Sequence, residues 1–149
     1  MIEDDLAQLR SVIAQDATAR DIDAALEPIA STRDPITIAP LLLMLNDDTE
    51  DEGLWPLVHA VEQFDDAIYI SHFLAALSGM VVASSRWAAI IMMRILNSDA
   101  SRAELIRQVR GAPTDTQEAA TFICGAINER DVRFLTKTAG VLIAASKGS

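Results

Sequence analysis

Residues 47–99 read DDTEDEGLWPLVHAVEQFDDAIYISHFLAALSGMVVASSRWAAIIMMRILNSD, and this stretch decides the fold. An acidic run at residues 47–52 opens it, and three apolar segments follow, separated by charged or small polar residues. Ala, Leu, Ile and Met dominate the apolar segments, and these residues favour helix over strand. The stretch therefore predicts three consecutive helices with carboxylates at or near their ends.

The polar residues inside this stretch predict the helix boundaries. Asp65-Asp66 caps the second helix, because a short carboxylate side chain accepts hydrogen bonds from the exposed N–H groups of a first turn. Gly79 is expected to loosen or end that helix, Met80–Ala83 to form an apolar connection, and Ser84 or Ser85 to cap the third helix. The third helix should then end at Asn97.

The remainder of the chain shows the same helical spacing. Further helices are predicted at residues 3–15, 21–29, 36–45, 103–109, 115–127 and 131–143. Two apolar runs, at residues 41–45 and 74–77, lie 33 residues apart, which is typical of paired helices in a HEAT-like repeat. The sequence predicts an all-α single domain over residues 1–149, built of antiparallel helix pairs. It is either a HEAT-like α-solenoid or an irregular bundle of about eight helices.

Helical spacing also predicts which large side chains face the core. Trp55 and Trp87 are expected to act as core anchors, and Ile68 and Phe122 are expected to point inward beside them. Cys124, the only cysteine, lies among apolar residues and is interpreted as a buried small side chain rather than a nucleophile.

Composition limits the class of protein. Half of the 149 residues are apolar, which excludes intrinsic disorder. No apolar run approaches the ~18 uninterrupted residues of a membrane span, and the acidic start argues against a secretory signal. A single cysteine excludes a disulfide framework. We therefore expect a cytoplasmic protein that does not bind a membrane.

The net charge of −10 is concentrated in the first half of the chain. Residues 1–75 hold 16 acidic and 3 basic side chains, whereas residues 76–149 hold 6 acidic and 9 basic ones. An acidic half of this size repels nucleic acid, so no direct nucleic-acid binding is expected. It attracts a basic protein and accelerates the encounter with it. A need for solubility explains the total charge but not its clustering.

The sequence contains no motif of a catalytic or cofactor site. His59, Glu62 and His72 lack the spacing of a zinc site, and His59 is expected to lie partly buried beside Trp55 instead. Counted from Asp48, the acidic loop has acids at positions 1, 3 and 5 of a calcium loop and Gly53 at position 6, but Pro56 falls at position 9 and His59 replaces the glutamate required at position 12. Nucleophile elbows and phosphate-binding glycine loops are also missing. We predict neither an enzyme, nor a metal site, nor a cofactor.

Three short motifs carry a family resemblance. They are Val58–Asp66 (VHAVEQFDD) followed by Tyr69, Ser84–Ala88 (SSRWA) and Arg94–Ser98 (RILNS). With these motifs, residues 54–107 resemble the immunity proteins of bacterial polymorphic-toxin and contact-dependent growth inhibition systems, in particular the immunity protein 30 family. Arg86 departs from the pattern, because a glutamate is expected before the tryptophan. If that glutamate contacts the partner in other members of the family, this chain binds its partner through other residues.

The resemblance implies a small cytoplasmic protein that binds the C-terminal effector domain of a cognate toxin and blocks its active site. Such effectors are often nucleases with a basic cleft, and the acidic half of this chain suits a basic partner. The predicted toxin contacts, which we expect one edge of the scaffold to gather, are Asp47, Asp48, Glu50, Asp51, Glu52, Glu62, Asp65 and Asp66. The alternative hypothesis is a HEAT-like adaptor for another basic protein or peptide.

Overall fold

The computed structural model describes residues 1–146, which form eight α-helices, two short 3₁₀-helices and no strand. The α-helices are α1 (Ile2–Ala14), α2 (Ala19–Ala30), α3 (Ile38–Leu43), α4 (Asp51–Val61), α5 (Asp66–Leu96), α6 (Asp99–Arg110), α7 (Thr114–Arg130) and α8 (Leu135–Ser146). The 3₁₀-helices are η1 (Pro35–Thr37) and η2 (Val132–Phe134). The all-α prediction is confirmed.

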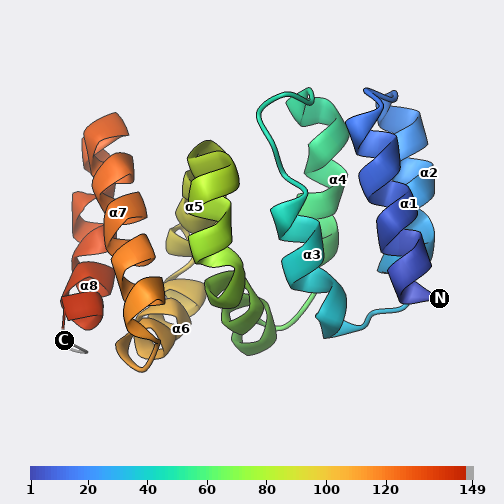
Figure 1. Cartoon of the computed structure of the whole chain (residues 1–149). Coiled ribbons are helices and arrows are strands. Elements are labelled where there is room, and N and C mark those ends of the chain that lie inside the picture. The colour runs from blue at the N-terminus through green and yellow to red at the C-terminus, as the bar shows by residue number, and fades with distance from the viewer. Residues whose placement is uncertain (147–149) are drawn as a thin grey trace.

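The helices stand side by side in one row, with α1 and α2 at one end and α7 and α8 at the other (Figure 1). Sequence neighbours pack as antiparallel pairs, α1 with α2, α3 with α4, and α7 with α8. Adjacent pairs are joined by contacts of α2 with α4, α3 with α5, and α5 with α7. The fold is thus a helical bundle in which antiparallel pairs are stacked, as the sequence predicted.

The long helix α5 consists of two arms that meet at Ser84. Ser84 has extended backbone angles (φ −161°, ψ 91°) inside an otherwise helical segment. Its Oγ accepts a hydrogen bond from the backbone N–H of Trp87 (3.3 Å), which is the geometry of a cap at the start of the second arm. The predicted cap at Ser84-Ser85 is confirmed.

The predicted connection at Met80–Ala83 is wrong, because these residues continue the first arm as helix. Gly79 does not end that arm either. A Cβ atom at Gly79 would lie 3.0 Å from Leu43 Cδ2, so the glycine allows close packing of α5 on α3. The glycine serves tertiary packing here rather than helix termination.

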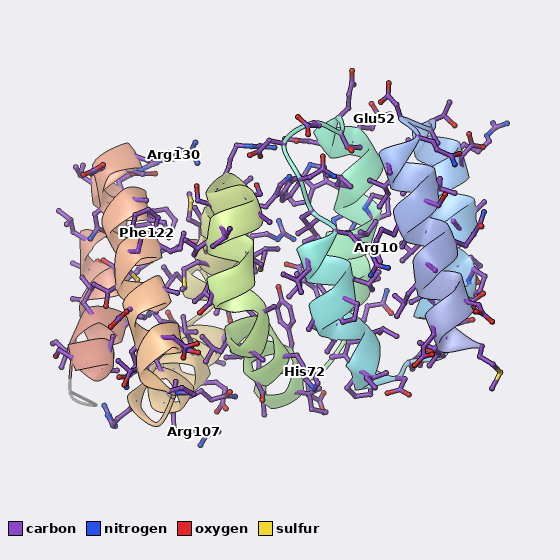
Figure 2. The ribbon with its side chains drawn as sticks, viewed as in Figure 1. Arg10, Glu52, His72, Arg107, Phe122 and Arg130 are labelled. Carbon is purple, nitrogen blue, oxygen red and sulfur yellow. The ribbon has the colours of Figure 1, made fainter. Side chains whose placement is uncertain are left out.

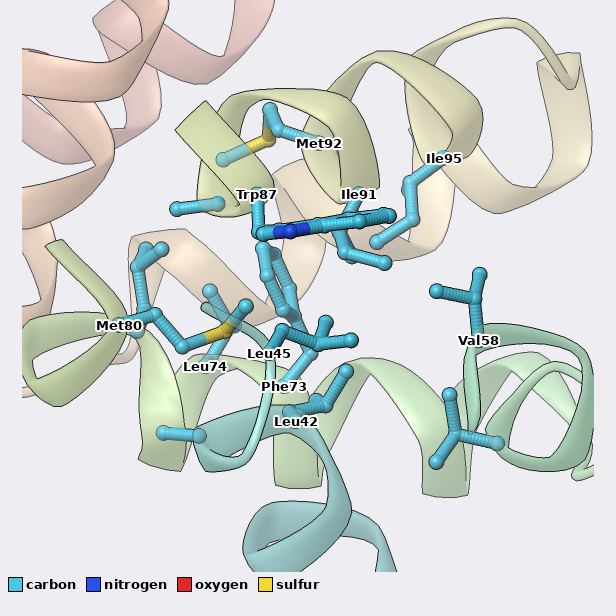
Figure 3. Close-up of a cluster of buried hydrophobic side chains, with 14 of the residues drawn as sticks. Leu42, Leu45, Val58, Phe73, Leu74, Met80, Trp87, Ile91, Met92 and Ile95 are labelled. Carbon is cyan, nitrogen blue, oxygen red and sulfur yellow. The ribbon is translucent and has the colours of Figure 1, made fainter. Parts of the chain in front are cut away.

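By length and composition alone, α5 could cross a membrane, with a mean hydropathy of 1.6 over its most apolar window. However, fifteen of its 31 residues are buried within the bundle. Figure 3 shows side chains of the first arm (Phe73 and Leu74), the second arm (Trp87 and Ile91) and the α3 region (Leu42) in one cluster. The apolarity of α5 is therefore that of a core helix with neighbours on most sides.

One cluster of buried apolar side chains extends from α1 to α8. Trp87 and Cys124 are fully buried in it, as predicted, and Trp55 packs against it while partly exposed. Ile68 and Phe122 are 37% and 58% exposed, so their predicted inward orientation is wrong. Phe122 lies on α7, but at about 100° per residue it is roughly 140° around the helix from the centre of the buried stripe.

Candidate partner-binding surface

Two tryptophans fill the space between α4 and the second arm of α5. The rings of Trp55 on α4 and Trp87 on α5 meet edge to face, with their centroids 5.2 Å apart. The His59 ring stacks on Trp55 with the centroids 6.1 Å apart, so the predicted neighbourhood is confirmed, but the His59 side chain is exposed and its predicted partial burial is wrong. Aromatic pairs in this arrangement add stability beyond their buried area.

Arg86 joins the second arm of α5 to the start of α4. Its Nε donates to Asp47 Oδ1 (3.0 Å), and its two terminal nitrogens donate to the two carboxylate oxygens of Asp51 (3.1 and 2.8 Å). Its guanidinium carbon also lies 5.1 Å from the centre of the Trp87 ring. The hydrogen bonds from Arg86 lower the pKa of the Asp51 carboxyl. A base therefore occupies the position where the family resemblance suggested an acid.

The loop between α3 and α4 is held by the same group of residues. The indole N–H of Trp87 donates to the backbone carbonyl of Asn46 (3.0 Å), and Ser84 Oγ donates to Asp47 Oδ1 (2.9 Å). The Asn46 side chain accepts hydrogen bonds from the backbone N–H groups of Asp48 (2.9 Å) and Thr49 (2.8 Å). These bonds fix the backbone of the acidic run before α4 begins.

Arg94 closes the opposite end of the α4–α5 contact. Its Nε and one terminal nitrogen donate to the two carboxylate oxygens of Glu62 (2.6 and 2.8 Å), and its guanidinium carbon lies 5.3 Å from the Trp55 ring centre. The nearby Tyr69 hydroxyl is buried and has no hydrogen-bond partner within residues 1–146. Burial raises the pKa of Tyr69, and the Glu62 carboxylate adds to the rise. We call Trp55, Trp87, Arg86, Arg94 and their carboxylate partners the tryptophan clamp.

Half of the eight acids predicted to contact a toxin are bound within the protein. Asp47, Asp51 and Glu62 pair with the clamp arginines, and Asp66 accepts a hydrogen bond from the hydroxyl of Ser101 (3.0 Å). The other four are exposed and form no ion pair in the described part of the chain: Asp48, Glu50, Glu52 and Asp65.

The structure divides the predicted acids between the two ends of α4. Residues 47–52 precede or begin this helix, and residues 62–66 follow it. The helix has 11 residues, so the two groups are about 16 Å apart along its axis. They are not gathered on one edge, and the two ends of α4 form separate candidate surfaces.

Sequence reasoning missed Asp16, which lies in the turn between α1 and α2. This turn and the α3–α4 loop both lie along the upper edge of the row of helices in Figure 1. Asp16 lines one cleft together with Asp48, and a second cleft together with Glu50 and Glu52. We call these four exposed carboxylates the acidic rim. No local sequence signal relates two loops that are more than thirty residues apart, and only the stacking of helix pairs brings them together.

No group of three or more His, Cys, Asp or Glu side chains in residues 1–146 is placed to hold a metal ion. The clustered carboxylates instead face solvent or arginine. Their arrangement supplies hydrogen-bond acceptors and a negative field at the surface, which suits recognition of cationic groups.

Comparison with protein families identifies one match. The model of the immunity protein 30 family matches residues 9–105, about two thirds of the chain. The matched segment begins well before Leu54, where the resemblance read from the sequence started, and it contains the whole tryptophan clamp and the acidic rim. Comparison with curated proteins and with solved structures finds no match.

Proposed function

Because the chain belongs to the immunity protein 30 family, whose members neutralise a cognate toxin, we propose that it inactivates a basic effector domain by stoichiometric binding through its acidic surface. Proteins of this family are typically not enzymes. The acidic rim is the observation that supports the proposal. Its four exposed carboxylates form no ion pair within the described residues and line two neighbouring clefts.

The charge distribution supports a basic partner such as a nuclease domain. A nuclease presents cationic side chains to its phosphate substrate, and a row of carboxylates can occupy the place of those phosphates. A surface of opposite sign accelerates the encounter, while a few desolvated contacts slow dissociation. Neutralisation of this kind requires occupancy of the cleft and no chemical step.

The tryptophan clamp contributes to binding by holding the acidic loop in place. Trp87 and Asn46 fix the loop backbone through the hydrogen bonds described above. A loop that is ordered before binding loses less conformational entropy when the partner arrives. In this proposal, Asp48, Glu50, Glu52 and Asp65 contact the toxin directly. The clamp acids Asp47, Asp51 and Glu62, together with Asp66, add to the negative field while they keep their internal partners.

The proposal places the protein in the cytoplasm of a bacterium that carries a polymorphic-toxin or contact-dependent growth inhibition system. There it would capture an incoming or newly synthesised effector before that effector reaches its substrate. The cognate effector is expected to be encoded next to this chain.

Co-expression tests this function. The neighbouring effector domain is expressed with this chain, with an empty vector, or with the variant Asp48→Lys/Glu50→Lys/Glu52→Lys, which leaves the clamp acids intact. We expect growth and co-purification with the wild-type chain, and loss of protection with the triple variant. Glu118→Lys/Glu129→Lys reverses two exposed acids on α7 and is the control that should still protect. Cell death with the wild-type chain present would contradict the proposal.

A further inference from the structure

We propose that the acidic rim borders a docking groove for a short cationic segment of the toxin, with one apolar side chain of that segment inserted between α1 and α3. This inference rests on the proposed function and specifies which surface performs it. The occupant is a peptide segment in which an apolar residue is flanked by lysine or arginine.

The groove consists of two adjoining clefts. The larger, of about 450 Å³, opens between α1 and α3, and the smaller, of about 300 Å³, opens between the α1–α2 turn and the start of α4. Asp16 and Thr49 line both clefts, so the two lie next to each other. The volume of the larger cleft lies in the range of ~300–1,000 Å³ that is typical of binding sites.

The floor of the larger cleft is apolar. Ile13 from α1 and Pro40, Leu43 and Met44 from the α3 region line it. Ile13 and Met44 are 7% exposed, whereas Leu43 remains 46% exposed although it is a large aliphatic side chain. An apolar side chain placed on this floor would cover Leu43 and gain the free energy of removing apolar area from water.

The walls of the groove are predominantly acidic. Asp16, Asp48, Glu50 and Glu52 surround it, and Arg10 is the one basic side chain among the lining residues. These four acids and one base give a net charge of −3, which favours a cationic occupant and opposes a phosphate-bearing one. In Figure 2, Arg10 lies between α1 and α3, where its donors can bind a backbone carbonyl of the segment. The apolar floor, the acidic walls and a single basic side chain together match a basic peptide.

The groove is already formed in the free protein. The Asn46 hydrogen bonds and the Trp87 indole hold the loop that carries Asp48. A Cβ atom at Gly53 would lie 3.0 Å from Ile22 Cδ1, so this glycine lets α4 approach α2 closely beneath the smaller cleft. Binding therefore requires little rearrangement of this chain.

The test measures binding of the purified effector domain to wild-type protein and to two groove variants. Leu43→Ala removes the exposed apolar side chain, and Asp16→Asn/Asp48→Asn neutralises two walls with isosteric amides. Asn is suited to position 16, where φ is 57°, because it tolerates the left-handed region. The matched controls are Ile143→Ala, at another exposed aliphatic residue (57%, on α8), and Glu118→Gln on α7.

We expect Leu43→Ala to raise Kd about 10-fold, as the loss of a buried anchor does. The double amide variant should slow association about 10-fold at low salt and less at high salt, because salt screens the charges that it removes. The controls should stay within about twofold of wild type, the scatter of energetically neutral contacts. If both groove variants bind the effector domain as tightly as the wild-type protein does, the proposed groove is refuted and the proposed function still stands. Absence of wild-type binding would instead refute the proposed function.

Hydrogen exchange on the wild-type complex gives a second readout that does not depend on variants folding. We expect slower exchange at residues 13–16 and 43–49 when the effector domain is added. Protection confined to other segments would overturn the groove. Concentration-dependent protection of residues 43–49 in the protein alone would also overturn it, because a second copy of this chain would then be the occupant.

Discussion

Replacing Arg86 with methionine tests whether the tryptophan clamp stabilises the bundle. Methionine keeps an aliphatic chain beside Trp87 and removes the charge that binds Asp47 and Asp51. The three side chains are 35%, 53% and 45% exposed, so solvent screens both ion pairs to about 0.2–1 kcal/mol each. The contact with the Trp87 ring adds about 0.5–1 kcal/mol. We expect a loss of about 2 kcal/mol, which lowers Tm by about 4–8 °C in a domain of this size.

The pH dependence separates charge from packing in this experiment. Arg86 lowers the folded-state pKa of Asp51, so the pair contributes its full stability above the unfolded pKa of about 3.9. That contribution is lost as the pH falls through the lower folded pKa. The difference in unfolding free energy between wild type and Arg86→Met should therefore be largest near neutral pH and shrink in strong acid. Urea unfolding at several pH values measures it.

Arg107→Met is the control for Arg86→Met. Arg107 pairs with Glu104 on the same helix, three residues away, and links no separate elements. Its replacement should leave Tm unchanged within error. The account of the clamp is refuted if the two variants behave alike, or if the effect of Arg86→Met is the same at all pH values.

Three further changes test individual features. Trp87→Phe removes the indole donor to the Asn46 carbonyl and leaves a small void, so the unfolding free energy measured in urea should fall by about 2–4 kcal/mol. A fall of less than about 1 kcal/mol would contradict the role of that hydrogen bond. Burial raises the pKa of the Cys124 thiol to about 12. A thiol reagent at mildly alkaline pH should therefore label Cys124 only after the protein is denatured. Rapid labelling of the native protein would contradict the burial of this thiol. Phe122→Ser should change stability by no more than about 0.5 kcal/mol, because this side chain is 58% exposed; a loss typical of a core residue in thermal unfolding would contradict its placement.

Local signals in the sequence were sufficient to predict the fold class and several helix boundaries. The cap at Ser84 was predictable because a serine hydroxyl accepts the N–H group three residues on, within one turn. The helical course of Met80–Ala83 was not, because Gly79 is explained by contact with Leu43 on another helix. The inward orientation predicted for Phe122 was wrong, because the spacing of apolar residues shows that α7 is a helix but not which of its faces packs against the neighbouring helices.

The candidate site was predictable only in part. The sequence shows where carboxylates cluster, but the partners of Asp47, Asp51 and Glu62 are arginines 32 to 39 residues further along the chain. These pairings depend on α4 and the second arm of α5 lying side by side. The three motifs that carry the family resemblance largely build this clamp, so part of what the sequence presented as a binding signal is structural. Asp16 joins the rim through the stacking of helix pairs alone.

We propose that this chain neutralises a basic effector domain by binding it. The decisive experiment titrates the protein into the purified effector domain, with the activity of the effector as readout. We predict complete loss of activity at one equivalent, with association that slows as salt is raised. Full effector activity in the presence of excess protein at low salt would contradict it.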